Sequence, residues 1–486
     1  MKAISNRYRR TVFTSFPAAA KFFKPFVAVT LLSLAASSCS KAPKVETVYQ
    51  QYCLSCHGAD LKGGLGGSLV DDEWKHGASD NDISRNIRDG LAEKGMPAWG
   101  KTLSEEQLRA LVIYIRERGA AAKQTQLLEQ TSPQAGVFNS QKYRFDMTPV
   151  AEGFEALWAM DFLPDGSILT TEKQSGRLWR LQGEKKIAIA GIPKSWPEGQ
   201  GGLMEVKVLP GNTDNPWVYL SYSEEKAGKG MTAIVRGKIT NNTWSQQEDI
   251  FHAPQGNFLS GGLHFGSRIV FKDDMVFFSI GERGRQDMAQ DLSVPNGKIH
   301  RLHLDGRTPK DNPFVSTAGA MPSIWSYGHR NPQGMALATN GQLWATEHGP
   351  RGGDETNLIL KGRNYGWPVI THGMNYDGTP ITDKTHHPDM EQPSYYWVPS
   401  IAVTALEIYG AKTFPLWNKS FLVGSLAREE LQRLEIVDGK LIHREVLLKN
   451  QGRIRDITTG PNGKVYLVIN RGSPKTGAIY QLSPVQ

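Results

Sequence analysis

Cysteine is scarce in this sequence, which holds three cysteines among 486 residues. Cys53 and Cys56 form one CxxC pair, and no second CxxC occurs. A structural zinc site built on cysteines needs more ligands than this pair supplies, so the sequence argues against one. A thioredoxin-like redox disulfide would need a surrounding βαβ pattern, which is also missing.

Long hydrophobic runs are missing as well. The apolar stretch over residues 25–36 is shorter than the roughly 20 residues that a membrane-spanning helix needs. It follows a basic start and leads into small residues, which is typical of an export signal, so we predict a signal peptide over 1–38. Ala36-Ser37-Ser38-Cys39 resembles a bacterial lipobox, which predicts lipidation of Cys39 and a periplasmic, membrane-anchored lipoprotein. An ordinary signal peptide cleaved nearby is the alternative.

A large charge of one sign is absent once this segment is removed. Residues 1–38 hold six basic residues and no acid, so a chain beginning at Cys39 would carry a net charge of +2 in place of +8. That balance gives no support to a nucleic acid partner. The length indicates at least two domains.

The CxxC pair continues into CxxCH, with His57 following Cys56. This pattern favours a c-type haem, in which two thioethers hold the porphyrin and the histidine binds iron. Met96 is the only methionine between residues 39 and 118, and a Met/His pair suits electron transfer, so we predict Met96 as the sixth ligand. His76 is the competing ligand.

A helix is expected after Met96. Ser104 and Gln107 fit a capping box, and apolar residues then follow at helical spacing. A terminal helix after a methionine loop resembles a small class I cytochrome c, over about residues 45–118. We therefore predict an all-α cytochrome c domain over 39–118, followed by a polar Ala/Gln/Ser-rich linker over 119–142.

From residue 143 onward the sequence has no long amphipathic helix and is rich in turn residues. A turn followed by an apolar strand recurs six times, at 162–169, 208–220, 271–277, 339–344, 417–422 and 460–466. Six such repeats predict an all-β, six-bladed β-propeller over residues 143–486. A pair of β-sandwiches is the alternative.

Several polar clusters directly follow predicted strands, where a propeller presents loops at the mouth of its channel. Residues 327–334 combine cationic and amide groups, and residues 347–355 combine glycines with two adjacent acids, whose oxygens could bind Ca²⁺. Arg453 and Arg455 alternate at strand spacing, so both could clamp a ligand that carries several carboxylates. His264 lies in a Gly-rich turn before an apolar strand.

Three long motifs in this region, GHRNPQG at 328–334, EHGPRGGDE at 347–355 and NYGWP at 364–368, point to one family. Residues 143–485 resemble the pyrroloquinoline quinone (PQQ)-dependent glucose/sorbosone dehydrogenases, and most closely their aldose sugar dehydrogenase branch. The resemblance implies a six-bladed propeller, in agreement with the repeats.

The resemblance also implies roles for matching residues. His264 matches the general base that removes the proton of the anomeric hydroxyl, and Arg330 and Asn331 match residues at the reacting quinone carbonyl. Gln200 matches a residue near substrate and cofactor, and Arg453 and Arg455 match the pair that binds the cofactor carboxylates. Gly349 and Pro350 match carbonyl ligands of the Ca²⁺ that polarises PQQ. Glu355 and the carbonyl of Tyr365 match ligands of a second, structural Ca²⁺.

Two positions depart from the family pattern. Leu263 stands where soluble glucose dehydrogenases have an acid just before the base, and Ala427 stands where they have a cofactor-binding lysine. The resemblance thus predicts a PQQ- and Ca²⁺-dependent enzyme that oxidises an aldose at C1 to a lactone. Its electrons would pass to the c-type haem and then to a periplasmic or membrane carrier. A dehydrogenase of a non-sugar alcohol or aldehyde, and an inactive propeller that binds carbohydrate or protein, are the alternatives.

Lipidation of Cys39 can be tested on the mature protein purified from membranes. We expect an intact mass for a chain that begins at Cys39 and carries acyl groups. An unmodified chain that begins at another residue would contradict the anchor.

Overall fold

The computed structural model describes residues 42–71, 73–123, 131, 133, 136–211, 213–472 and 476–485. The predicted signal peptide and Cys39 lie outside these residues. No helix in the described ranges is both long and apolar enough to cross a membrane. Residues 42–486 belong to one structural unit.

The N-terminal part is helical, and its last helix begins where the capping box predicted. The helices are α1 (Val45–Tyr52), α2 (Leu54–His57), α3 (Asp80–Asp89), the 3₁₀ turn η1 (Ala92–Lys94) and α4 (Glu105–Ala122). The Ser104 hydroxyl accepts the backbone N–H of Gln107, whose side chain accepts the N–H of Ser104 in return. The apolar face of α4 packs on α1 through Leu108, Leu111, Val112 and Ile115. The predicted small α-helical domain is thus confirmed.

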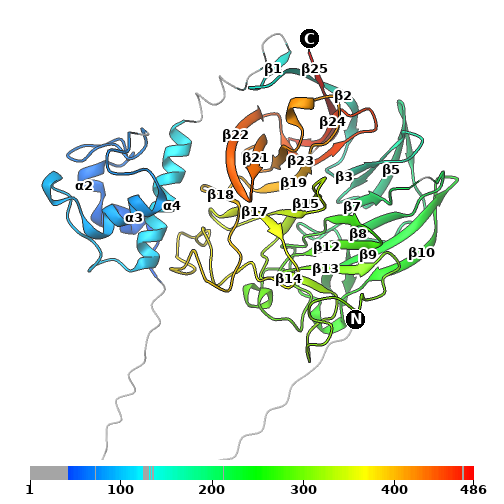
Figure 1. Ribbon diagram of the computed structural model, residues 1–486, viewed down its shortest axis with the longest axis horizontal. Coiled ribbons are helices and arrows are strands. Elements are labelled where there is room, and N and C mark those ends of the chain that lie inside the picture. The colour runs from blue at the N-terminus through cyan, green and yellow to red at the C-terminus, as the bar shows by residue number, and fades with distance from the viewer. Residues whose placement is uncertain are drawn as a thin grey trace, which may run out of the picture. The chain divides into compact units, whose positions relative to one another are not determined.

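The rest of the described chain forms six antiparallel sheets in a ring (Figure 1). The first three blades are β3 (Leu157–Phe162), β4 (Ile168–Glu172), β5 (Arg177–Gln182) and β6 (Lys185–Ala188); β7 (Leu203–Val208), β8 (Val218–Lys226), β9 (Lys229–Thr240) and β10 (Thr243–Phe251); and β11 (Ile269–Lys272), β12 (Met275–Ile280), β13 (Lys298–His303) and β14 (Ile324–Tyr327). Short 3₁₀ turns η2 (Gln255–Asn257), η3 (Gln286–Ala289) and η4 (Pro415–Trp417) lie in connections.

The last three blades complete the ring. They are β15 (Pro332–Leu337), β16 (Leu343–Glu347), β17 (Asp354–Ile359) and β18 (Tyr395–Trp397); β19 (Val403–Ile408), β20 (Phe421–Ser425), β21 (Glu430–Val437) and β22 (Lys440–Lys449); and β23 (Arg453–Thr459), β24 (Val465–Arg471) and β25 (Thr476–Pro484) with β2 (Arg144–Phe154) and β1 (Val137–Asn139).

The sixth blade closes the ring by combining both ends of the propeller sequence. β2 pairs antiparallel with β25, so that Met147 lies opposite Leu482. This pairing leaves the ring without an open edge between its first and last blades. The segment predicted as a linker over 119–142 includes the last turn of α4 and the strand β1, whose Phe138 is buried in the propeller core.

The six sequence repeats all fall between the first and second strands of a blade, which confirms the predicted propeller. For example, the turn at Asp165-Gly166 joins β3 to β4, and the turn at Asn462-Gly463 joins β23 to β24. The first strands of neighbouring blades contact one another around the centre (Figure 1). The loops that precede these first strands therefore converge at one end of the ring.

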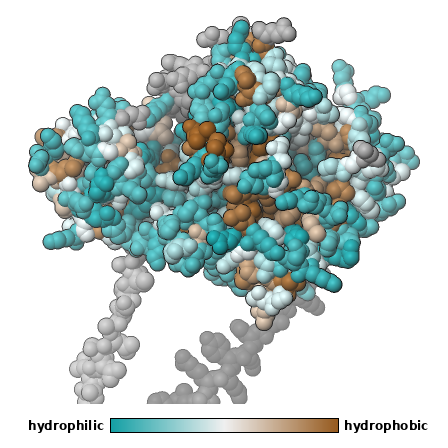
Figure 2. Space-filling model, viewed as in Figure 1, coloured by the Kyte–Doolittle hydropathy of each residue, from teal (hydrophilic) through white to brown (hydrophobic). Residues whose placement is uncertain are grey.

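The hydrophobic core lies between neighbouring sheets. Trp158 and Leu169 of the first blade pack against Leu203 and Leu220 of the second, and all four are fully or almost fully buried. The face of the molecule in Figure 2 is mostly hydrophilic, with separate hydrophobic patches. Burial between blades fixes the angle of each sheet and hence the position of each inner loop.

Candidate active site and haem site

The candidate base His264 lies on the loop before β11. Its backbone adopts the left-handed conformation (φ 51°) and its side chain is almost completely buried. The backbone N–H of His264 donates to Oε1 of Gln200 (2.9 Å), and the N–H of Gln200 donates to the carbonyl oxygen of Gly262 (2.7 Å). Gln200, predicted near substrate and cofactor, therefore holds the loop that carries the base.

A carboxylate supports His264 from another part of the chain. Nδ1 of His264 lies 2.5 Å from Oε1 of Glu282, whose side chain is 1% exposed. A carboxylate accepts hydrogen bonds, so Nδ1 carries the ring proton and Nε2 is left to accept one from substrate. Leu263, the residue before the base, is 52% exposed. Glu282 was not predicted from the sequence. It follows β12, and no sequence motif longer than Gly-Glu-Arg surrounds it.

Burial is the main influence on the charge of His264. It lowers the pKa of His264, the hydrogen bond to Glu282 opposes this, and the Arg330 and Arg283 guanidinium groups lower the pKa further. The imidazole is consequently neutral at neutral pH, which is the state that a general base requires.

Arg330 and Asn331 lie on the turn before β15, beside the loop after β16. The backbone N–H of Arg330 donates to Glu347 (2.7 Å), and its guanidinium donates to the carbonyl oxygen of Gly349 (2.8 Å). Oδ1 of Asn331 accepts the N–H of Gly266 (3.0 Å), which leaves the buried Nδ2 without a partner among the described residues.

His348 was within a predicted motif but had no assigned role, and the structure places it in the site. Its Nε2 is buried and has no hydrogen-bond partner among the described residues. Burial lowers the pKa of His348 well below its usual value, and Arg330, Arg455 and His264 add to the effect. These four residues, from four segments that belong to three blades, are therefore close neighbours.

Arg453 and Arg455 on β23 lie near each other and near a third guanidinium group, that of Arg268. The Arg455 guanidinium lies 4.5 Å from the ring centroid of Trp158 and makes no hydrogen bond to any described residue. Burial lowers the pKa of Arg455 to about 9, together with the charges of Arg268 and Arg453. Arg453 donates to the carbonyl oxygen of Leu426 (3.0 Å). A ligand that carries carboxylates would remove this charge repulsion and satisfy the open donors.

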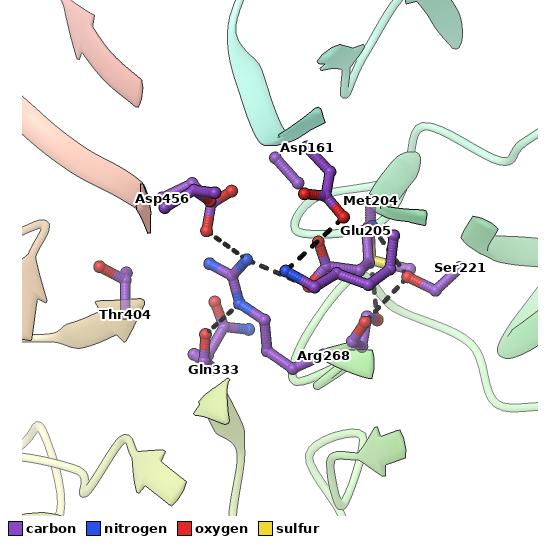
Figure 3. A network of polar contacts seen from close by, with 12 residues as sticks. Asp161, Met204, Glu205, Ser221, Arg268, Gln333, Thr404 and Asp456 are labelled. Carbon is purple, nitrogen blue, oxygen red and sulfur yellow. Dashed lines mark hydrogen bonds and ion pairs between the residues drawn. The ribbon is translucent and has the colours of Figure 1, made fainter. Parts of the chain in front are cut away.

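A buried polar network is centred on Arg268, with Glu205, Gln333 and Asp456 around it (Figure 3). Arg268 donates to Asp456 (2.6 Å), Glu205 (3.2 Å) and the carbonyl oxygen of Arg455 (2.8 Å). Burial raises the pKa of Glu205 to about 7, although the Arg268 charge opposes it. The network fixes the backbone at the register shift between Ile454 and Asp456, from which the Arg455 side chain projects.

The predicted calcium loop is held by a buried carboxylate. Asp354 accepts the N–H groups of Gly349 (2.9 Å), Ile401 (2.9 Å) and Val403 (3.1 Å) and the hydroxyl of Ser400 (2.6 Å). No group of three or more His, Cys, Asp or Glu side chains suited to a metal occurs within the described ranges. The groups predicted to bind Ca²⁺ on this loop are the backbone carbonyl oxygens of Gly349 and Pro350.

Glu355, predicted at a second calcium site with Tyr365, lies beside another acid. Burial and, after it, the charge of the neighbouring Glu347 raise the pKa of Glu355 to about 8. Nδ2 of Asn357 bridges the two carboxylates at 3.1 Å each. A hard cation would stabilise this pair in its charged form, so the donor set fits Ca²⁺.

The CxxCH motif lies on α2 and the turn before it. Nδ1 of His57 is 2.9 Å from the carbonyl oxygen of Gly67, which makes Nδ1 the protonated nitrogen and leaves Nε2 for iron. Cys53 and Met96 pack against the same hydrophobic cluster, whereas His76 is exposed. This arrangement favours Met96 over His76 and fits a covalently attached haem.

Comparison with known proteins identifies the family. Residues 154–480 match the family described as Glucose / Sorbosone dehydrogenase, and residues 40–115 match Cytochrome C oxidase, cbb3-type, subunit III. Since the first match spans more than half of the chain, the protein belongs to the glucose/sorbosone dehydrogenase family. It is therefore an oxidoreductase of the sugar dehydrogenase class that carries a cytochrome c domain on the same chain. The fusion that the motifs indicated is confirmed.

Individual relatives agree with this assignment. Aldose sugar dehydrogenase YliI of Escherichia coli (strain K12) is 38% identical over 335 residues, which cover 67% of this chain and 90% of the relative. Quinoprotein glucose dehydrogenase B of Acinetobacter calcoaceticus is 27% identical over 416 residues, covering 67% and 85%. A crystal structure of a glucose dehydrogenase is 38% identical, with a TM-score of 0.66, and covers 69% of this chain and 98% of that one.

The substitution Glu282→Gln tests whether Glu282 supports His264 as the candidate base. We expect kcat/KM to fall roughly 10²- to 10⁴-fold, because the amide no longer selects the tautomer with a free Nε2. The hydrogen bond to Glu282 raises the pKa of His264, so the acidic limb of the pH profile should also move to lower pH. Glu248→Gln, at an exposed partner of Arg236, is the control. A Glu282 variant with an unchanged profile would contradict the pairing.

Met96→Ala tests the sixth haem ligand. Loss of the thioether should lower the reduction potential and change the absorption spectrum of the haem, because a Met/His pair raises the potential. Both are measured by a spectroelectrochemical titration of the purified holoprotein. The comparison is His76→Ala, which should change neither property; the opposite result would make His76 the ligand.

Proposed function

We propose that this protein is a PQQ- and Ca²⁺-dependent aldose dehydrogenase that delivers electrons to its own haem. The observation that carries the proposal is the pairing of His264 with Glu282 beside the guanidinium groups of Arg330 and Arg455 and the unpartnered nitrogens Nδ2 of Asn331 and Nε2 of His348. One bound sugar could meet the base on one side and a carboxylate-bearing quinone on the other. The names of the relatives support a sugar substrate and a quinone cofactor.

The chain's own residues would carry out the following steps. Nε2 of His264 takes the proton of the C1 hydroxyl, and the Arg330 guanidinium stabilises negative charge near the accepting carbonyl. Arg453 and Arg455 would hold the cofactor carboxylates. Gly349 and Pro350 would offer carbonyl oxygens to one Ca²⁺, and Glu355 and the carbonyl of Tyr365 would hold a second, structural Ca²⁺. PQQ, when bound, would supply a two-electron acceptor for the hydride that leaves C1.

The reaction balances without oxygen. An aldose loses two electrons and two protons at C1 and becomes a lactone. Cys53, Cys56, His57 and Met96 would hold a haem that accepts these electrons one at a time, and the protons would leave to solvent. A second carrier, periplasmic or in the membrane, must reoxidise the haem.

The remaining parts of the proposal concern the domain limits, export and the covalent link between the two domains. We propose the domain limits 1–38 for the signal peptide, 39–118 for the cytochrome c domain, 119–142 for the linker and 143–486 for the propeller. Export to the periplasm with a lipid on Cys39 would place the haem near a respiratory acceptor. Tethering the haem to the dehydrogenase would keep the two at high effective concentration.

The proposal is tested by loading the purified holo-cytochrome with PQQ and Ca²⁺ and adding an aldose without any other acceptor. We expect sugar-dependent reduction of the haem, followed in the visible spectrum, and formation of the lactone. His264→Ala should abolish the reduction while leaving the haem spectrum intact. Turnover of simple alcohols alone would favour the non-sugar alternative, and a loaded protein that oxidises nothing would favour a binding module.

A further inference from the structure

The loop that carries the predicted calcium ligands also contacts the haem domain. Arg351 directly follows Pro350, and its backbone pairs with Met374 through two hydrogen bonds of 3.0 Å. Its side chain leaves the propeller and reaches Glu117 on α4, where Nε lies 3.0 Å from both carboxylate oxygens and Nη2 lies 2.8 Å from Oε2. The same Nη2 is 2.8 Å from Glu46 on α1.

These two acids lie on the helices that build the haem site. Glu46 is in the first turn of α1, which leads into the CxxCH motif, and Glu117 is in α4, which packs on α1. Arg351 and Glu117 are each only about one fifth exposed, at 21% and 20%. A charge pair that is largely shielded from water is stronger than an ordinary surface pair.

A second polar cluster joins the same two domains. The hydroxyl of Tyr396 donates to Asp80 (3.2 Å), which also binds Arg109 (3.3 Å) and Arg116 (2.9 Å). His372 stacks on Tyr396 with ring centroids 3.7 Å apart, and its Nδ1 lies 3.2 Å from Arg109. Asp80 and Arg109 are 13% and 12% exposed, so this cluster is also shielded.

Apolar and backbone contacts accompany these polar clusters. Met374 is 1% exposed and belongs to the hydrophobic cluster of the haem domain. A Cβ on Gly352 would lie 3.4 Å from Cγ2 of Ile113, so the loop backbone closely approaches α4. The N–H of Val45 donates to the carbonyl oxygen of Gly378 (3.0 Å), which links the start of α1 to the propeller.

We propose that Arg351 is a positioning residue that holds the haem domain against the cofactor loop, so that electrons leave the quinone site for the haem within one chain. The inference rests on the proposed function for the origin of those electrons. A bound haem would supply a one-electron acceptor, so the two electrons of one turnover would pass through it singly, with reoxidation by the external carrier between them. Arg351 transfers nothing itself; it fixes the distance and orientation of donor and acceptor.

The test reverses the charges on the haem-domain side, which leaves the propeller unchanged. In the protein loaded with PQQ and Ca²⁺, E46R/E117R should keep its rate of sugar oxidation with an artificial dye. Its sugar-driven haem reduction should slow about tenfold, since losing a partly shielded ion pair costs on the order of a factor of ten in an equilibrium. Adding R351E to this variant restores opposite charges and should restore haem reduction.

Glu105→Arg is the matched control, because Glu105 also lies on α4 but pairs with Arg88 inside the haem domain. It should leave both rates unchanged. Haem reduction at the original rate in E46R/E117R would overturn the inference, as would equal losses with dye and haem or a triple variant that fails to recover.

A measurement without substrate separates this inference from the proposed function. Small-angle scattering of the haem-loaded protein should give a larger radius of gyration for E46R/E117R than for the original chain, and the original value for the triple variant. This result would stand even if no sugar were oxidised. An unchanged radius in E46R/E117R would show that Arg351 does not hold the haem domain.

Discussion

The antiparallel pairing of β2 with β25 is the constraint on which the rest of the propeller depends. It closes the ring, and closure forces the first strand of every blade toward the centre. The loops before those strands then meet at one end. Gln200, His264, Arg330 and Arg455 are far apart in the sequence, yet each belongs to a different blade's inner strand or its preceding loop. The pairing of β2 with β25 thereby brings residues of four blades together in one site.

Within that site, the charges are divided between two layers. Carboxylates lie behind the functional groups: Glu282 orients His264, Glu347 fixes Arg330, and Asp354 holds the loop of Gly349. The groups that face the site include the guanidinium groups of Arg330 and Arg455, the unpartnered amide nitrogen of Asn331 and the neutral imidazoles of His264 and His348. Buried polar groups of this kind cost stability unless a ligand satisfies them. The arrangement is suited to an anion with several acceptor oxygens, bound beside the neutral imidazole of His264.

The position of Arg351 connects this site to the cytochrome c domain. The loop from Glu347 to Asp354 has one side in the propeller, where Gly349 meets Arg330, and another side at the haem domain, where Arg351 meets Glu117. Asp354 anchors this loop in the core. The same short segment can therefore serve cofactor binding and domain association, and a disturbance of one would be transmitted to the other.

The sequence by itself determined the blades, the helix α4 and the haem motif, because these depend on local signals: turn residues before apolar strands, a capping box, and CxxCH. It also supplied the family, through three uninterrupted motifs. Only the tertiary structure decided that Glu282 is the partner of His264, that His348 joins the site, and that Arg351 meets Glu117, 234 residues away. These contacts join distant segments and have no periodicity or fixed spacing. They exist only after ring closure and domain packing have brought the segments together.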